Sequence, residues 1–150
     1  MQRRNYLLKN RLLFLLLILS FISCGRKSPL SVHRHTLPFK VVFLQADKKE
    51  GVWVVKGEVI GEKKGYKISD IIGCRIYYSR FSFDKLPCEE CPIYLGKLKE
   101  VRKNVIKDKL FYLELPWLDK EGVYYIKIRL LGKGNSIGPA SDLLKIVERE

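Results

Sequence analysis

From residue 39 onward, short apolar runs rich in Val, Ile, Tyr and Leu alternate with clusters of Gly, Asp, Lys and Pro. No run sustains the three-to-four-residue period of an amphipathic helix. Short strands separated by regular turn signals are typical of an antiparallel β-sandwich. The pattern therefore predicts an all-β domain of about seven strands, at residues 40–46, 52–60, 72–78, 94–98, 109–115, 123–131 and 143–147.

The clearest alternation lies in residues 123–131. Apolar side chains stand at every second position from Tyr124 to Leu130, and Lys127 and Arg129 lie between them. Successive side chains of a strand point to opposite faces of the sheet. We therefore expect Tyr124 to begin a row that faces the core, while the two cations face water.

This strand and its neighbours resemble a fibronectin type III domain. Residues 118–130 (L-x5-Y-x-I-x-I-x-L) and 132–141 (GKGNSIGPAS) look like the family's L-x-x-G-x-x-Y-x-h-x-h run and its G-x-x-G-P-x-S turn. Residues 72–78 (IGCRIYY) are similar to its third strand, G-Y-x-V-Y. The resemblance covers residues 39–147. It implies an immunoglobulin-like sandwich in which the hydroxyl of Tyr124 forms a tyrosine corner.

The chain begins with a different pattern. Residues 12–23 carry no charge, the segment before them carries Arg3, Arg4, Lys9 and Arg11, and Ser23 precedes Cys24. A basic start, a short apolar run and a small residue at its end indicate a secretory signal peptide, expected to be helical. Residues 21–24 (FISC) resemble the lipobox of bacterial lipoproteins, which implies diacylglycerol on Cys24, removal of residues 1–23 and acylation, typically by palmitate, of the new amine.

Two other interpretations of residues 12–23 stay open. A spanning helix needs to cover about 30 Å of hydrocarbon, whereas twelve residues cover only about 18 Å. Ordinary cleavage prefers small residues at the first and third positions before the cut, and Phe21 occupies the third. The lipoprotein interpretation is favoured over both.

Residues 24–38 form a polar, basic linker with Pro29 and Pro38. Its head, residues 24–30 (CGRKSPL), also looks like the C-G-x-K-G-P-L start of small lipoproteins that assist the lipopolysaccharide translocon. His33 and His35 could share a metal, but a stable site needs three or four ligands. We interpret both histidines as solvated and expect no metal site.

The charge of the chain favours anionic partners. The formal net charge is +13, and residues 1–23 hold four of the basic residues and no acid, which leaves +9 after cleavage. Such a surface favours lipid headgroups or polysaccharide, and export makes nucleic acid unsuitable as a partner. Residues 97–109 hold six basic residues, which suit either a headgroup-binding ribbon or an edge strand protected by lysines.

Four cysteines are present, of which the lipid would occupy Cys24. Cys88 and Cys91 lie in a turn-prone segment between Pro87 and Pro92, where a local disulfide is the favoured interpretation outside the cytosol. Cys74 alternates with core-facing isoleucines, which predicts a buried free thiol. A redox-active pair, a zinc site and a disulfide through Cys74 remain as alternatives.

The sequence offers no recognisable catalytic motif. Adjacent carboxylates at Glu89 and Glu90, and at Asp119 and Glu121, fall in polar turns where solvation is expected. The tryptophans, Trp53 and Trp117, are interpreted as packing residues rather than a ligand platform.

The sequence thus predicts a lipoprotein signal peptide at residues 1–23, a lipidated linker at 24–38 and a fibronectin type III-like β-sandwich at 39–150. We expect a non-catalytic binding or scaffolding protein of the bacterial cell envelope, with no cofactor beyond the lipid on Cys24. Its partners would be the membrane, through the anchor, and an envelope protein or polysaccharide. In a Gram-negative host the residue after Cys24, Gly25, favours the outer membrane. The alternatives are an envelope-assembly helper acting through residues 24–30 and a thiol oxidoreductase using Cys88 and Cys91.

Overall fold

The structure is a computed structural model, and it describes residues 36–62, 64–88 and 90–149. The predicted signal peptide at residues 1–23, the predicted lipidation site Cys24, and the linker histidines His33 and His35 lie outside the described residues.

Nine strands in the described part of the chain form two antiparallel sheets. In chain order they are β1 (Lys40–Lys49), β2 (Val52–Ile60), β3 (Ile71–Phe81), β4 (Lys97–Val101), β5 (Ile106–Lys107), β6 (Leu110–Leu115), β7 (Gly122–Gly132), β8 (Ile137–Ala140) and β9 (Leu144–Glu148). Three single turns of 3-10 helix connect some of them: η1 (Ile68–Asp70), η2 (Phe83–Lys85) and η3 (Lys133–Asn135).

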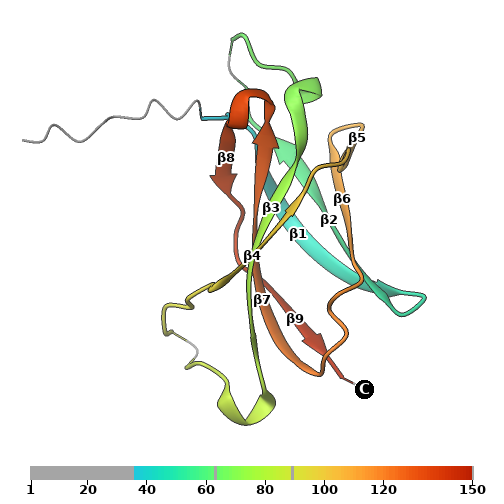
Figure 1. Cartoon of the computed structure of the whole chain (residues 1–150), viewed down its shortest axis with the longest axis vertical. Coiled ribbons are helices and arrows are strands. Elements are labelled where there is room, and N and C mark those ends of the chain that lie inside the picture. Colours follow the sequence, from blue (N-terminus) through green and yellow to red (C-terminus); the bar gives the residue numbers. More distant parts are fainter. Residues whose placement is uncertain (1–35, 63, 89, 150) are drawn as a thin grey trace, which may run out of the picture. The chain divides into compact units, whose positions relative to one another are not determined.

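The strand order confirms the predicted immunoglobulin-like sandwich. One sheet runs β1-β2-β6-β5, and the other runs β4-β3-β7-β8, with β9 also paired to β7 (Figure 1). β8 pairs with the C-terminal half of β7 and β9 with its N-terminal half, so the two act as one interrupted edge strand. This arrangement corresponds to the A-B-E-D and C-F-G sheets of immunoglobulin-like domains, with β4 added beside the C strand.

The core lies between the sheets and follows the alternation of the sequence. In β6, Phe111, Leu113 and Leu115 are buried while the residues between them are exposed. The β7 row that begins at Tyr124 is buried and packs with Cys74 and Ile76 of β3, as its period of two predicts. Core residues from both sheets therefore form one cluster.

Three strands differ from the sequence-based prediction. The two-residue strand β5 was not expected, and it pairs with Leu110 and Phe111 of β6 at the edge of its sheet. The strand expected at residues 94–98 is displaced: β4 begins only at Lys97, because the Ser79 hydroxyl bonds the backbone of Tyr94 and Gly96 and delays pairing until Lys97 meets Tyr78. Part of the expected turn at residues 132–141 is the strand β8. It ends where Ser141 binds the backbone of Ile128 through both its amide and its hydroxyl.

Tyr124 forms the corner that the resemblance implies. Its hydroxyl donates a hydrogen bond to the Lys120 carbonyl at 2.8 Å, and burial raises the pKa of this phenol. Gly122 enters β7 with φ of +141°, where a Cβ would stand 2.6 Å from the Phe81 carbonyl oxygen. A glycine is therefore required where the connection from β6 turns into β7.

A buried carboxylate links the two sheets along one side. Glu148 of β9 accepts hydrogen bonds from the Lys48 ammonium of β1 and the Trp53 indole N–H of β2. The hydrogen bond from Lys48 is the main cause that lowers the pKa of Glu148 below its ordinary value of 4.5. Trp53 also packs against the core, in agreement with its predicted packing role.

The substitution Glu148→Gln should lower the free energy of unfolding by about 1–2 kcal/mol at pH 7. It replaces the charge-assisted hydrogen bond from Lys48 to a buried carboxylate by one to a neutral amide. Since folding lowers the pKa of Glu148, its contribution is complete above the unfolded-state pKa and disappears as pH falls through the folded-state value. Urea unfolding therefore measures the free energy of unfolding of the variant and of the wild type at pH 7 and at pH 3. The difference between the two proteins should be smaller at pH 3.

Asp142→Asn is the matched control, because its ion pair with Lys40 is exposed. We expect a change of less than about 0.5 kcal/mol. A difference for Glu148→Gln that stays constant between the two pH values would contradict the assigned role of the carboxylate.

Candidate functional site

The candidate site begins with two lysines on an exposed edge strand. β4 stands at the end of its sheet, and its residues Lys97 and Lys99 pair with Tyr78 and Ile76 of β3. Because Ile76 is buried in the core, the alternation places both lysines on the core-facing side of β4. At a sheet edge, side chains on that side reach over the opening between the sheets.

Two aromatic rings lie beneath these lysines. The rings of Tyr78 and Trp117 are tilted by 44° with centroids 4.4 Å apart. The Lys99 ammonium stands 4.5 Å from the Trp117 ring centroid, and that of Lys97 stands 5.9 Å from the Tyr78 centroid. Cation–π attraction at these distances holds the ammonium groups over the rings. Trp117 thus packs as predicted, and it also forms part of a surface hollow.

We call this hollow of about 220 Å³ the basic groove; it is lined by Tyr78, Arg80, Lys97, Lys99, Trp117, Asp119, Lys120 and Tyr124. Four of these side chains are cations and one is a carboxylate. Among the described residues, no carboxylate oxygen lies within 4 Å of the four cationic groups. Arg80 donates to the Glu121 carbonyl at 2.8 Å, which fixes the guanidinium at the rim. The groove therefore has an excess of positive charge that the described residues do not neutralise.

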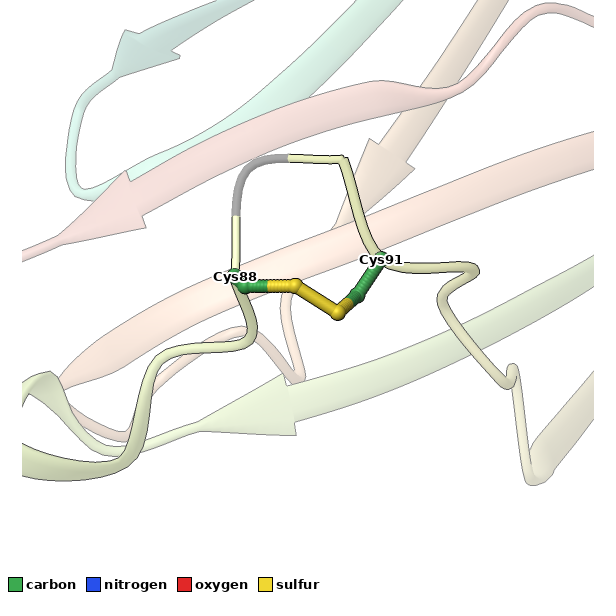
Figure 2. The surroundings of a disulfide bond; sticks show 2 residues. All are labelled: Cys88 and Cys91. Atoms are coloured by element: carbon green, nitrogen blue, oxygen red, sulfur yellow. A yellow bond between two sulfur atoms is a disulfide. The ribbon is translucent and has the colours of Figure 1, made fainter.

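Next to the basic groove is a loop closed by a disulfide, which we call the cystine loop (residues 82–96). Cys88 and Cys91 form a disulfide (Figure 2), with Cα atoms 5.2 Å apart. The Cys91 amide also donates a hydrogen bond to the Cys88 carbonyl. The predicted local disulfide is therefore present, and the alternative of a disulfide through Cys74 is not.

The Ser79 hydroxyl attaches the cystine loop to β3. It donates to the Tyr94 carbonyl at 2.8 Å and accepts from the Gly96 amide at 3.0 Å. A second hollow, of about 540 Å³, lies between this loop and β3, and it shares Arg80 and Lys97 with the basic groove. Tyr94, with 84% of its surface exposed, also lines it. The two hollows therefore form one continuous candidate surface.

The cysteines show no sign of an active thiol site. Burial raises the pKa of the Cys74 thiol to about 12, so this thiol stays protonated at neutral pH. The residues at Cys88 and Cys91 are loop and turn, and no helix begins at either. The helix N-terminus that lowers a thiol pKa in many redox-active pairs is therefore not present at either of these two cysteines. Within the described ranges, no three His, Cys, Asp or Glu side chains gather as a metal site.

A larger hollow of about 960 Å³ lies at the other end of the sandwich. Its charged lining is mixed, with Glu58, Glu62 and Asp108 opposed by Lys64 and Lys109. Charges of both signs select neither an anion nor a cation, so this hollow is the weaker candidate.

Sequence reasoning identified only part of the candidate surface. Of the predicted basic segment at residues 97–109, only Lys97 and Lys99 line the basic groove, and Arg102 instead pairs with Glu100. The position of β4 at the sheet edge agrees with the interpretation of a protected edge. Arg80 and Lys120 were missed. Arg80 is one residue before the end of β3, and Lys120 is two residues before the start of β7. These positions indicate a shared site only once the pairing of β3 with β7 is known.

No protein-family model matches the chain, and no curated protein matches it in sequence. Among solved structures, the third fibronectin III domain of the human KIAA0343 protein is similar, with a TM-score of 0.49 and 16% identity over 84% of this chain and 94% of that one. A myokine structure is also similar, with a TM-score of 0.43 and 10% identity over 76% of this chain and 100% of that one.

Because both similarities are modest, the fold assignment rests on the strand order and on the Tyr124 corner. A fibronectin type III-like sandwich is an architecture that many cell-surface domains share. No helix formed by residues 36–62, 64–88 or 90–149 is long and apolar enough to cross a membrane.

Thiol titration tests the cysteine assignment. A chain carrying Cys24→Ser, purified from the cell envelope and unfolded without reductant, should show one thiol, that of Cys74, because Cys88 and Cys91 are bonded. After reduction it should show three. Adding Cys74→Ala should leave none without reductant, whereas three thiols before reduction would contradict the disulfide.

Proposed function

We propose that this protein is a lipid-anchored, extracytoplasmic binding protein of the bacterial cell envelope. The anchoring is supported by the apolar residues 12–23 and by the lipobox-like residues 21–24, FISC. The disulfide between Cys88 and Cys91 supports a location outside the reducing cytosol. Both features are expected of a domain that is exported and held at a membrane.

The basic groove is the observation that carries the binding role. Its polar lining consists mainly of cations, which suit the binding of an anionic partner rather than acid–base catalysis. None of its described side chains forms a nucleophile–base pair. We infer a non-catalytic protein whose sandwich presents this surface to a partner.

The position of the basic groove also suits an anchored domain. Thr36 forms a bridge to Ile137, beside the end of β7 that pairs with Ile71. The basic groove lies near Arg80, which is farther along β3 than Ile71 by about 30 Å at roughly 3.3 Å per residue. The described chain therefore enters the sandwich beside β8 (Figure 1), and the groove lies toward the other end of β3.

The envelope-assembly alternative concerns residues 24–30, which lie outside the described residues, so it stays a prediction from the sequence. In a Gram-negative host, the proposed location is the periplasmic face of the outer membrane.

Metabolic labelling with radioactive palmitate tests the anchor. In a bacterial host, the full chain should incorporate the label and appear in the membrane fraction. Cys24→Ser should abolish the label and leave a precursor that still carries residues 1–23, because the modified sulfur is absent. Acyl chains contribute about 0.8 kcal/mol per buried CH₂, so their loss should release the domain once residues 1–23 are also removed.

The double variant Cys88→Ser/Cys91→Ser is the matched control, since it removes two other cysteines and should keep the label. A wild-type chain without label, or a label that persists in Cys24→Ser, would refute lipid attachment at this residue.

A further inference from the structure

We infer that the basic groove binds the carboxylate or phosphate groups of an acidic polysaccharide. This inference rests on the proposed extracytoplasmic role, because it assigns a ligand class to the same surface. Three observations carry it: the arrangement of cations, the size and connection of the two hollows, and the origin of the lining residues from several elements.

The cations of the groove are held in place yet remain available. Cation–π contacts position Lys97 and Lys99, and a hydrogen bond to the Glu121 carbonyl positions Arg80. An ammonium over a ring still has donors directed away from it. Lys120, in the connection before β7, adds a further charge to the lining of the groove. An anionic group would therefore meet several fixed donors at once, and little ordering of side chains would be needed.

The small size of the basic groove and its connection to the second hollow favour a polymer over a compact ligand. The basic groove, at about 220 Å³, is smaller than the roughly 300–1,000 Å³ of sites that enclose drug-sized ligands. It can take one charged substituent. The adjoining hollow is lined by Pro87, Pro92, Ile93 and Tyr94, which offer an apolar surface for a sugar ring. A chain of charged sugars can occupy both hollows, because they share Arg80 and Lys97.

The described domain begins at Thr36, at the end of the sandwich that holds Gly132 and Ile137. The groove and the cystine loop lie toward the opposite end, where Phe81 pairs with Val123. The groove is therefore separate from the point where the described chain enters the sandwich.

Protection of an edge strand explains the lysines of β4 but not the whole groove. Inward-pointing charges on edge strands prevent pairing with other chains. Arg80 belongs to β3, however, and Lys120 belongs to the connection between β6 and β7. These two cations converge on the same hollow as Lys97 and Lys99 without contributing to the edge.

Binding of polygalacturonate tests the inference. The full chain in neutral detergent micelles is titrated with polygalacturonate, with uncharged dextran as the comparison polymer. We expect saturable binding to polygalacturonate alone, weakened when salt rises from about 0.1 M to about 1 M and the Debye length falls from about 10 Å to about 3 Å. Lys97→Gln/Lys99→Gln should weaken binding about tenfold or more, as expected when two charge-assisted contacts are lost.

Lys64→Gln/Lys107→Gln is the matched control, because it removes the same charge from exposed sites outside the groove. It should change affinity by less than about twofold. Arg80→Gln/Lys120→Gln provides a second test that leaves β4 intact, and it should reproduce the loss. Equal losses in groove and control variants, or no loss in either groove variant, would overturn the inference.

Vesicles of phosphatidylcholine with and without phosphatidylglycerol separate the membrane from the polysaccharide. Binding to the anionic vesicles that depends on Lys97 and Lys99, without binding to polygalacturonate, would overturn the inference in favour of headgroups. Palmitate labelling is independent of these measurements. An unlabelled chain that still binds polygalacturonate would refute the anchor alone, and a labelled chain that does not bind would refute the ligand alone.

Discussion

The antiparallel pairing of β3 with β7 is the contact on which the rest of the domain depends. It joins the two longest strands, from Ile71 opposite Gly132 to Phe81 opposite Val123. On its inner side the pairing brings the Tyr124 row against Cys74 and Ile76, which forms half of the core. Where Phe81 pairs with Val123, it fixes where the connection from β6 ends and β7 begins. Without this pairing, the Tyr124 corner, β4 and the two halves of the final edge would have no support.

The sequence was sufficient to predict those strands in which apolar and polar residues alternate. The alternation from Tyr124 onward predicts its own burial, and β2 has the predicted bounds, Val52–Ile60. The start of β4 was not predictable, because the Ser79 hydroxyl determines it from fifteen residues away. The strand β8 was also not predicted, because its Gly-Pro sequence is typical of a turn. The hydrogen bonds between Ser141 and Ile128, which fix the end of this strand, involve residues that are distant in the sequence. Local patterns specify strands, whereas side-chain bonds to the backbone decide where they begin and end.

The candidate surface was less predictable than the fold, for the same physical reason. Lys97 and Lys99 attract notice as charges at alternate positions, but their partners Tyr78 and Trp117 come from separate segments. Arg80 and Lys120 lie forty residues apart and meet only because β3 and β7 are paired. The disulfide was predictable, since Cys88 and Cys91 are too close in sequence to require knowledge of the fold. A surface that is assembled from several strands and loops cannot be predicted from the sequence pattern of any one of them.

The Ser79 hydroxyl, which both donates to and accepts from the returning backbone, makes the cystine loop independent of its own disulfide. Opening the four-residue ring between Cys88 and Cys91 would free two thiols while leaving the stem of the loop fastened to β3. The hydrogen bonds of Ser79 would then still hold the stem of the loop beside Arg80 and Lys97 after reduction of the cysteines. The disulfide constrains the tip of the loop and is not needed for its attachment to β3.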